Sequence, residues 1–215
     1  MISIDEKENS TAADLVLVPA FSAQFEEVRS ELVRKSIHFL IALTPAIAAF
    51  DRSFAVILLA GGTLFYAFAE RNRIAGVTMP LISSLTAMAA RDRDLGRFVL
   101  GPVTLGLGAL LSLLLYPDPA ASVAIYALAF GDGLASLVGK VFGRFRPAFL
   151  MGKSVEGSLA CFVAVLLASW KVTADFRLSL FAALVATLVE ALPLEDYDNI
   201  ALPLAVGLTV RVLGG

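Results

Sequence analysis

Apolar residues fill most of the chain in runs that short polar segments separate. The runs cover residues 36–50, 53–69, 76–90, 98–116, 120–139, 155–172, 177–193 and 199–213. A helix needs about 20 apolar residues to cross a bilayer, and several runs fall short of that length. Short runs can borrow their polar ends or re-enter the membrane without crossing. The pattern therefore predicts an all-α, polytopic transmembrane helix bundle.

Before the first run, the pattern changes to apolar positions that alternate with charged ones. Phe21, Phe25 and Val28 recur at helical spacing within residues 15–35. This spacing predicts an N-terminal amphipathic helix that lies at the membrane interface and leads into the first crossing. Residues 1–14 are polar and acidic. They lack the positive start and apolar core of a signal peptide, so we expect no cleavable leader.

The positions of the basic residues indicate which runs cross. If all eight runs cross, the two sides of the membrane hold nine and eight Lys and Arg residues, and no orientation follows. If the short, glycine- and proline-interrupted run 76–90 only dips into the membrane, the split becomes thirteen against four. The four are Arg52, Lys171, Arg177 and Arg211. We therefore predict seven crossings plus one short re-entrant or interfacial run, with a cytoplasmic N-terminus and an external C-terminus.

Composition supports a membrane protein of one domain. Of the 215 residues, 58% are hydrophobic, and the mean hydropathy is +0.82, whereas soluble domains are about 45–50% apolar. The single cysteine, Cys161, excludes a disulfide framework within the chain. The net charge of −2 indicates no particular partner, and we expect no nucleic acid ligand. We divide the chain into residues 1–30, the polar N-terminus with the interfacial helix, and residues 31–215, a single transmembrane domain.

The strongest chemical signal lies in residues 129–161. Asp132 interrupts an apolar run, and a carboxylate inside such a helix is costly enough to be a functional-site candidate by default. Positions 131, 135, 139 and 143 are Gly, Ala, Gly and Gly, a seam of small residues that lets another backbone approach. A polar row lies beside this seam at i,i+4 spacing: Asp132, Ser136, Lys140 and Arg144. Asp132 is explained either by a salt bridge with Lys140 or an arginine, or by metal binding or proton transfer, which we favour.

The loop after this helix carries a phosphate-binding pattern. Gly152 and Lys153 precede Ser154, a suitable N-cap for the helix that follows. A helix N-terminus flanked by Lys and Gly favours phosphate. The loop is not a Walker P-loop, because Pro147 stands where that motif needs glycine.

Two further clusters flank this region. Glu31, Arg34, Lys35 and His38 form E-x-x-RK-x-x-H at the start of the first crossing, where basic residues can also be simple interfacial anchors. Near the other end, Glu190 lies in an E-x-LP motif, and an Asp-Asn pair follows an acidic stretch at residues 195–199. A carboxylate and a carboxamide oxygen suit Mg²⁺, although such a stretch can also be an ordinary solvated loop.

Together, these motifs resemble the dolichol kinase and phytol kinase family of integral-membrane, CTP-dependent lipid kinases. The specific part is GD-x-x-A-x-x-x-G-x-x-x-G followed by KS-x-EGS, between Gly131 and Ser158. The resemblance implies CTP-dependent phosphorylation of the hydroxyl of a membrane lipid alcohol, such as phytol, geranylgeraniol, dolichol or another polyprenol, or diacylglycerol. The alternatives are a cytidylyltransferase that forms a CDP-lipid and a non-enzymatic lipid-phosphate transporter.

The resemblance also implies roles for individual residues. The catalytic residues are Asp132, His38 and Lys153, with either Asp132 or His38 as the base. The nucleotide-binding residues are Arg34, Lys35, Lys140, Gly152, Lys153, Ser154, Glu156, Gly157 and Ser158. The ligands of the Mg²⁺ cofactor are Asp132, Glu190, Asp198 and Asn199. The expected partners are a lipid alcohol, a nucleoside triphosphate and the bilayer, with the active face cytoplasmic and a homodimer left open.

Overall fold

The structure is a computed structural model. It describes residues 28–77 and 96–214, together with Met79, Ser84, Thr86, Met88 and Asp94 between these ranges. The described residues form helices and connecting loops and include no strand, which confirms the predicted all-α class. The interfacial helix predicted within residues 15–35 lies mostly outside the described residues, as does the run 76–90.

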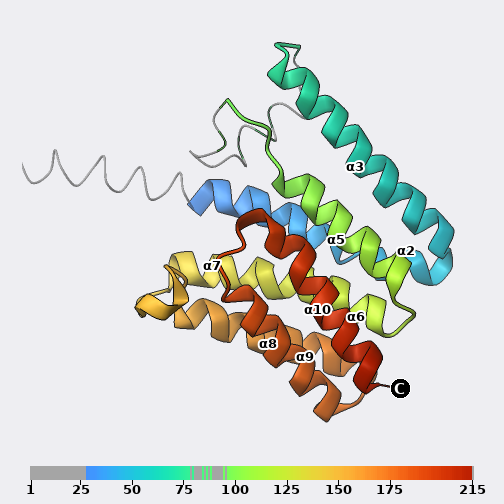
Figure 1. Cartoon of the computed structure of the whole chain (residues 1–215), viewed down its shortest axis with the longest axis vertical. Coiled ribbons are helices and arrows are strands. Elements are labelled where there is room, and N and C mark those ends of the chain that lie inside the picture. The colour runs from blue at the N-terminus through green and yellow to red at the C-terminus, as the bar shows by residue number, and fades with distance from the viewer. Residues whose placement is uncertain are drawn as a thin grey trace, which may run out of the picture.

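The chain forms one helix after another (Figure 1). Residues 28–41 are helical and are called the first helix below. The longer elements that follow are α2 (Thr44–Phe50), α3 (Arg52–Ile74), α5 (Gly101–Leu115), α6 (Ala120–Tyr126), a π-helical turn η2 (Ala127–Asp132), α7 (Gly133–Val141), α8 (Val155–Thr173), α9 (Phe176–Glu190) and α10 (Asp198–Leu213). Short 3-10 turns, η3 (Ala148–Leu150) and η4 (Glu195–Tyr197), lie in the loops.

Four segments are long and apolar enough to span a membrane: Val28–Phe50, Arg52–Ile74, Ala120–Val141 and Val155–Thr173. In Ala120–Val141, 61% of the apolar window is buried inside the protein, against 17–22% in the other three. A helix that is apolar on all sides and covered on all sides belongs at the centre of a bundle. The α6–η2–α7 segment is therefore the central helix, and the bilayer faces its neighbours.

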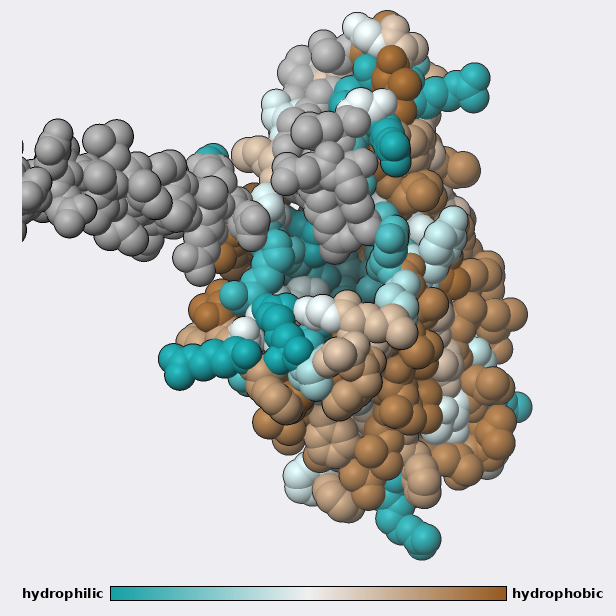
Figure 2. Space-filling view, turned by 60° about the vertical axis from the view of Figure 1, so that its left-hand side comes forward, coloured by the Kyte–Doolittle hydropathy of each residue, from teal (hydrophilic) through white to brown (hydrophobic). Residues whose placement is uncertain are grey.

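The outer helices expose apolar side chains to the surroundings. On α3, large side chains such as Ile57, Leu64 and Phe68 are more than half exposed, while Ala55 and Ala69 on its inner side are buried. Figure 2 shows a mostly hydrophobic outer surface, with the hydrophilic side chains gathered around one hollowed area. An exposed apolar exterior of this kind is suited to lipid, so the protein is an integral membrane protein.

Hydrogen bonds show which helix ends lie together. At one end, the Arg52 guanidinium donates to the carbonyls of Leu113 and Tyr116, joining the start of α3 to the end of α5. At the other end, the backbone N–H of Val99 donates to Glu70, joining the end of α3 to the start of α5. The chain thus leaves α3 and enters α5 at the same end of the bundle. The prediction of seven crossings requires this of α3 and α5, and the number of crossings stays a prediction.

The small-residue seam packs α7 against α8 as predicted. A Cβ added at Gly157 would lie 2.7 Å from the carbonyl oxygen of Ala135, and one added at Gly131 would lie 2.8 Å from the side chain of Val165. These positions therefore need glycine for the two backbones to approach. Because α7 ends at Val141, Arg144 lies in the loop that follows, and the predicted polar row does not continue on the helix that far.

Candidate active site

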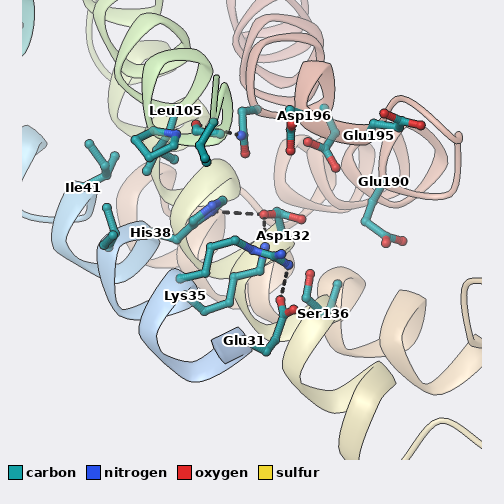
Figure 3. Close-up of a pocket in the computed structure, with 18 of the residues that line it drawn as sticks. Glu31, Lys35, His38, Ile41, Leu105, Asp132, Ser136, Glu190, Glu195 and Asp196 are labelled. Atoms are coloured by element: carbon teal, nitrogen blue, oxygen red, sulfur yellow. Dashed lines mark hydrogen bonds and ion pairs between the residues drawn. The ribbon is translucent and has the colours of Figure 1, made fainter. Parts of the chain in front are cut away.

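A cavity of about 790 Å³ opens at the end of the bundle where α7 and α9 end and α5, α8 and α10 begin. Twelve of the residues predicted from the sequence line it: Arg34, Lys35, His38, Asp132, Lys140, Gly152, Lys153, Ser154, Gly157, Glu190, Asp198 and Asn199. Segments far apart in the sequence thus bring their polar residues to one place (Figure 3).

Asp132 is the last residue of the π-helical turn, and only 5% of its surface is exposed. The Lys35 ammonium donates to its Oδ2 at 2.5 Å, and His38 Nδ1 lies 3.0 Å from the same oxygen. Figure 3 shows both side chains reaching Asp132 from the first helix. Because both contacts use Oδ2, the other carboxylate oxygen is available to a ligand in the cavity. A π-helical turn inside an α-helix often marks a functional site.

A second ion pair joins the same two helices near the cavity opening. Glu31 is buried and pairs with Arg34 on its own helix, and Lys140 Nζ of α7 lies 3.2 Å from its Oε2. Lys140 therefore pairs with Glu31 and not with Asp132, for which the sequence had suggested it as a partner. The partner of Asp132 is Lys35, which the sequence had placed in the phosphate-binding group.

Ser154 caps α8 as predicted, since its hydroxyl accepts the backbone N–H of Gly157 at 3.1 Å. Next to it, Lys153 donates to the backbone carbonyl of Glu190, and its Nζ lies 3.1 Å from Glu190 Oε1. Ser158 donates to the other oxygen of Glu190 at 3.2 Å. The start of α8 and the end of α9 are therefore tied together at the cavity wall.

Two predicted nucleotide-binding residues, Glu156 and Ser158, do not line the cavity. The Glu156 carboxylate accepts the backbone N–H groups of Arg144, at 3.0 Å, and Phe145, at 3.2 Å. It thereby fixes the loop that leads to Lys153. In this arrangement, Glu156 and Ser158 support residues of the cavity wall and do not form it.

The amide of Asn199 has a fixed orientation. Its Nδ2 donates to Thr104 Oγ1 at 3.0 Å and to the carbonyl of Gly101 at 3.3 Å, while its Oδ1 is buried without a hydrogen-bond partner. Buried polar atoms usually have a hydrogen-bond partner, so this oxygen can accept one from a water molecule or bind an ion. Gly101 and Thr104, at the start of α5, hold this amide. Nothing in their sequence pattern indicated that contact.

The chemistry of this part of the wall fits Mg²⁺. Asn199, Asp132 and Asp198 line the same cavity. Asp198 precedes the apolar run 199–213, and burial together with the nearby Asp132 carboxylate raises the pKa of its side chain to about 7. Among the described residues, no group of three or more His, Cys, Asp or Glu side chains could hold a metal ion alone. Mg²⁺ commonly takes one or two carboxylates and completes its shell with substrate phosphates and water.

The other part of the cavity is apolar. Ile37, Leu40 and Ile41 line it from the first helix, and Leu58 and Leu59 line it from α3. His38 lies on the same helical segment as the first three residues and also contacts Asp132. The cavity thus joins an ionic region to an apolar one, with His38 near their boundary.

Comparisons with known proteins identify the family of the chain. No family model and no solved structure matches the chain. A probable chloroplastic phytol kinase of Triticum aestivum is 30% identical over 95% of this chain and 75% of its own length. Phytol kinase 1 of Arabidopsis thaliana is 27% identical over 61% of this chain and 49% of its own length. A probable phytol kinase 1 of Oryza sativa is 29% identical over 65% of this chain and 50% of its own length. The chain therefore spans about half the length of these last two relatives, and its similarity to the wheat protein over nearly all of its own length shows that it belongs to the phytol kinase family.

Proposed function

We propose that this protein transfers the terminal phosphoryl group of a nucleoside triphosphate to the hydroxyl of a membrane lipid alcohol. One observation carries the proposal: a single cavity combines an ionic region with apolar walls. The phosphates of a nucleotide need the ionic region, and a lipid chain needs the apolar walls. The names of the relatives, phytol kinases, favour an isoprenoid alcohol as acceptor.

Five cations line the ionic region: Arg34, Lys35, Lys140, Arg146 and Lys153. Phosphoryl transfer depends mainly on positioning and on neutralising the phosphate oxygens. Carboxylates hold four of these cations: Glu31 pairs with Arg34 and Lys140, Asp132 with Lys35, and Glu190 with Lys153. The carboxylates keep the cations in place before the nucleotide binds. The nucleotide's polyphosphate carries more negative charge than one carboxylate. It would therefore attract these cations and form ion pairs with them in addition to the carboxylates.

Asp198, Asn199 and Asp132 would hold Mg²⁺, directly or through water, with Glu190 nearby on the cavity wall. The ion would neutralise charge on the transferred phosphoryl group and its leaving group. If this assignment is right, Asp198→Asn should abolish turnover. It should also raise the Mg²⁺ concentration at which Mg²⁺ and nucleotide together stabilise the protein against heat. If Asp198→Asn leaves the Mg²⁺ dependence of both turnover and thermal stability unchanged, the acidic segment does not bind Mg²⁺.

The hydroxyl of the lipid needs a group that accepts its proton. We assign this role to His38, because Asp132 contacts its Nδ1 and thereby leaves Nε2 for the substrate. A carboxylate that orients an imidazole in this way is a recurrent arrangement for a general base. Lys35, which shares the same carboxylate oxygen, would keep Asp132 ionised.

CTP is the donor that the family resemblance suggests, and the experiment tests it directly. Purified protein is incubated with Mg²⁺, a panel of lipid alcohols and CTP, ATP or UTP that carries the label in the γ-phosphate. Transfer of label to a lipid supports the kinase. In parallel incubations with the lipid monophosphates, release of labelled pyrophosphate with formation of a CDP-lipid would show a cytidylyltransferase instead. Absence of both with every donor and acceptor would overturn the enzymatic proposal.

We further propose that the cavity opens on the cytoplasmic side, where nucleotide is available and where most basic residues are expected. Arg146, at the cavity, and Arg211, near the end of α10, lie toward opposite ends of the bundle. Cysteines placed at these two positions should therefore react with an impermeant reagent from opposite sides, in a background where the native Cys161 is buried. Labelling from one side only would contradict this topology.

A further inference from the structure

We propose that the hydrocarbon chain of the lipid alcohol enters the cavity sideways from the bilayer, between the first helix and α3, and that Gly62 determines how bulky a chain fits there. This inference rests on the proposed function and adds to it the path of the substrate and a residue that sets its specificity.

The two helices form the sides of an opening. They are joined through α2 and diverge from it, the first helix in blue and α3 in teal (Figure 1). Leu40 and Leu58 line the cavity from these two helices, yet 64% and 49% of their surfaces are exposed. A residue that faces both the cavity and the outer surface lies at an opening between them. Because the outer surface here is apolar, the opening leads toward lipid.

The size of the cavity requires such an opening. Its volume of about 790 Å³ includes the ionic region that the nucleotide phosphates would occupy. Cavities of roughly 300–1,000 Å³ each bury one drug-sized molecule. A nucleotide and the whole of a long lipid do not fit together in this space, so most of the chain must remain outside. The opening between Leu40 and Leu58 lets the chain stay in the bilayer, whereas the ionic loop at Lys140 and Arg146 would expose it to polar groups.

Gly62 leaves room at this wall. A Cβ added at Gly62 would meet nothing within 4 Å, and Gly62 lines the cavity. The next residue, Thr63, packs tightly against α5, since a Cβ added at Gly106 would lie 2.1 Å from its hydroxyl oxygen. This contact places Gly62 at a close, fixed approach of α3 to α5. A larger side chain at position 62 would project into the path of the lipid chain.

The neighbouring Gly61 supplies a matched control. A Cβ added there also meets nothing within 4 Å, but Gly61 does not line the cavity. Gly61→Leu and Gly62→Leu therefore add the same side chain to the same helix, one outside the cavity and one inside it. Neither residue belongs to the ionic region, so a difference between the variants reports the space that the lipid chain needs.

The first experiment compares KM values for a C20 isoprenoid alcohol, a C5 isoprenoid alcohol and the nucleotide. Gly62→Leu should raise the KM for the C20 alcohol by about tenfold or more, as expected when a pocket is narrowed by a few carbon atoms. It should leave the KM values for the C5 alcohol and the nucleotide unchanged. Gly61→Leu should change none of the three. Equal effects of the two variants, or an equal effect of Gly62→Leu on both alcohols, would overturn the proposal.

The second experiment locates the chain without relying on turnover. An isoprenoid alcohol with a photoreactive diazirine in its first isoprene units is cross-linked to the wild-type protein, and the labelled peptides are identified by mass spectrometry. Labels should fall on residues 37–41 and 58–62, and Gly62→Leu should reduce them while Gly61→Leu should not. Labels confined to α8 and α9 would overturn the lateral path even in an active kinase. Labels at the predicted residues in a protein without kinase activity would keep the path and reject the proposed function.

Discussion

Glu70 and Asp132 are both buried carboxylates in apolar helices, and their surroundings differ in kind. Glu70 is fully buried, and Arg73 donates to both of its oxygens at 2.8 and 2.7 Å. The backbone N–H of Val99 donates to Oε1 at 2.9 Å. Glu70 does not line the cavity. Both of its oxygens are occupied, by Arg73 on the same helix and by the backbone N–H that joins α3 to the segment before α5.

Asp132 has partners that come from 97 and 94 positions away along the chain, and both use one oxygen. Its carboxylate lines the cavity together with His38 and Lys35. A carboxylate held by a neighbouring arginine fork and a backbone N–H is complete without a ligand. The Asp132 carboxylate binds a lysine and an imidazole through one oxygen, and its second oxygen can still bind a ligand. The comparison separates a structural role for Glu70 from a chemical role for Asp132.

Asp132→Asn should have the largest effect on activity. It keeps the shape of the side chain but removes the charge that orients His38 and draws Mg²⁺ into the cavity. We expect turnover to fall by roughly 10²–10⁴-fold, the usual contribution of a general base. The protein should still fold, because the amide oxygen that replaces the carboxylate can still accept a hydrogen bond from Lys35. Phosphoryl transfer and the thermal midpoint in detergent measure the two effects.

The double variant Lys35→Met/Asp132→Asn provides the control for a structural ion pair. Removing one member of a buried pair typically costs about 3–5 kcal/mol, and removing both members often recovers that loss. If Asp132 served only to neutralise Lys35, the double variant would regain both stability and turnover. We expect no recovery of turnover. Recovery of both would assign Asp132 to the same class as Glu70.

Glu70→Ala should have the opposite result: it should lower stability and leave turnover unchanged. It leaves Arg73 without its partner and the Val99 N–H unsatisfied, so the free energy of unfolding should fall by about 3 kcal/mol. We place it at the low end of the range because the side chain of Arg73 is 25% exposed and can reach water. Turnover of the fraction that remains folded should match the wild type. Glu70→Gln, which keeps an acceptor for Val99, should lose less stability. A specific loss of turnover in either variant would break the distinction from Asp132.

Lys153→Ala tests the cation at the start of α8. Loss of one charge-assisted contact with phosphate costs about 1.5–3 kcal/mol, or roughly 10- to 100-fold in nucleotide binding. The KM for the nucleotide should therefore rise by this factor, with the KM for the lipid unchanged. Lys171→Ala, which removes a lysine from the other end of the same helix, is the matched control and should change neither. Wild-type nucleotide use by Lys153→Ala would make Lys153 an anchor between α8 and α9.

Sequence reasoning succeeded where the relevant physics is local. The Ser154 cap depends on residues within one helical turn, and the glycine seam depends on helical periodicity, so both could be recognised before the structure. The gathering of charged motifs at one end followed from the alternating direction of successive membrane passes. These features place most of the candidate site without any knowledge of packing.

Sequence reasoning failed where the outcome depends on how helices pack. The contacts of Lys35 with Asp132 and of Lys140 with Glu31 depend on the relative rotation of the first helix and α7, which periodicity does not specify. The hydrogen bond from Asn199 to Thr104 joins residues 95 positions apart, and its geometry depends on α5 packing against α10. The π-helical turn before Gly133 has no residue pattern that distinguishes it from an ordinary helix.

Glu31 shares features with both Glu70 and Asp132, and its replacement should have the smallest effect on activity. Like Glu70, it is buried and pairs with an arginine three positions later. Like Asp132, it lines the cavity and has a distant partner, Lys140. Its cations keep some contact with water, since the side chains of Arg34 and Lys140 are 17% and 39% exposed. The pair with Lys140, the more exposed of the two, should therefore contribute no more than about 1 kcal/mol.

Glu31→Gln keeps the size of the side chain and releases both cations. If Glu31 positions Lys140 for the phosphates, the KM for the nucleotide should rise by about fivefold, the equivalent of about 1 kcal/mol. Combining it with Lys140→Met should then add little to the effect of either single variant, because both remove the same contact. When Glu31→Gln is combined with Arg34→Met, the non-additive effect should appear in the thermal midpoint and not in the nucleotide KM. A Glu31→Gln variant that loses only stability, with an unchanged nucleotide KM, would show that Glu31 supports the fold as Glu70 does and that Lys140 needs no carboxylate to bind phosphate.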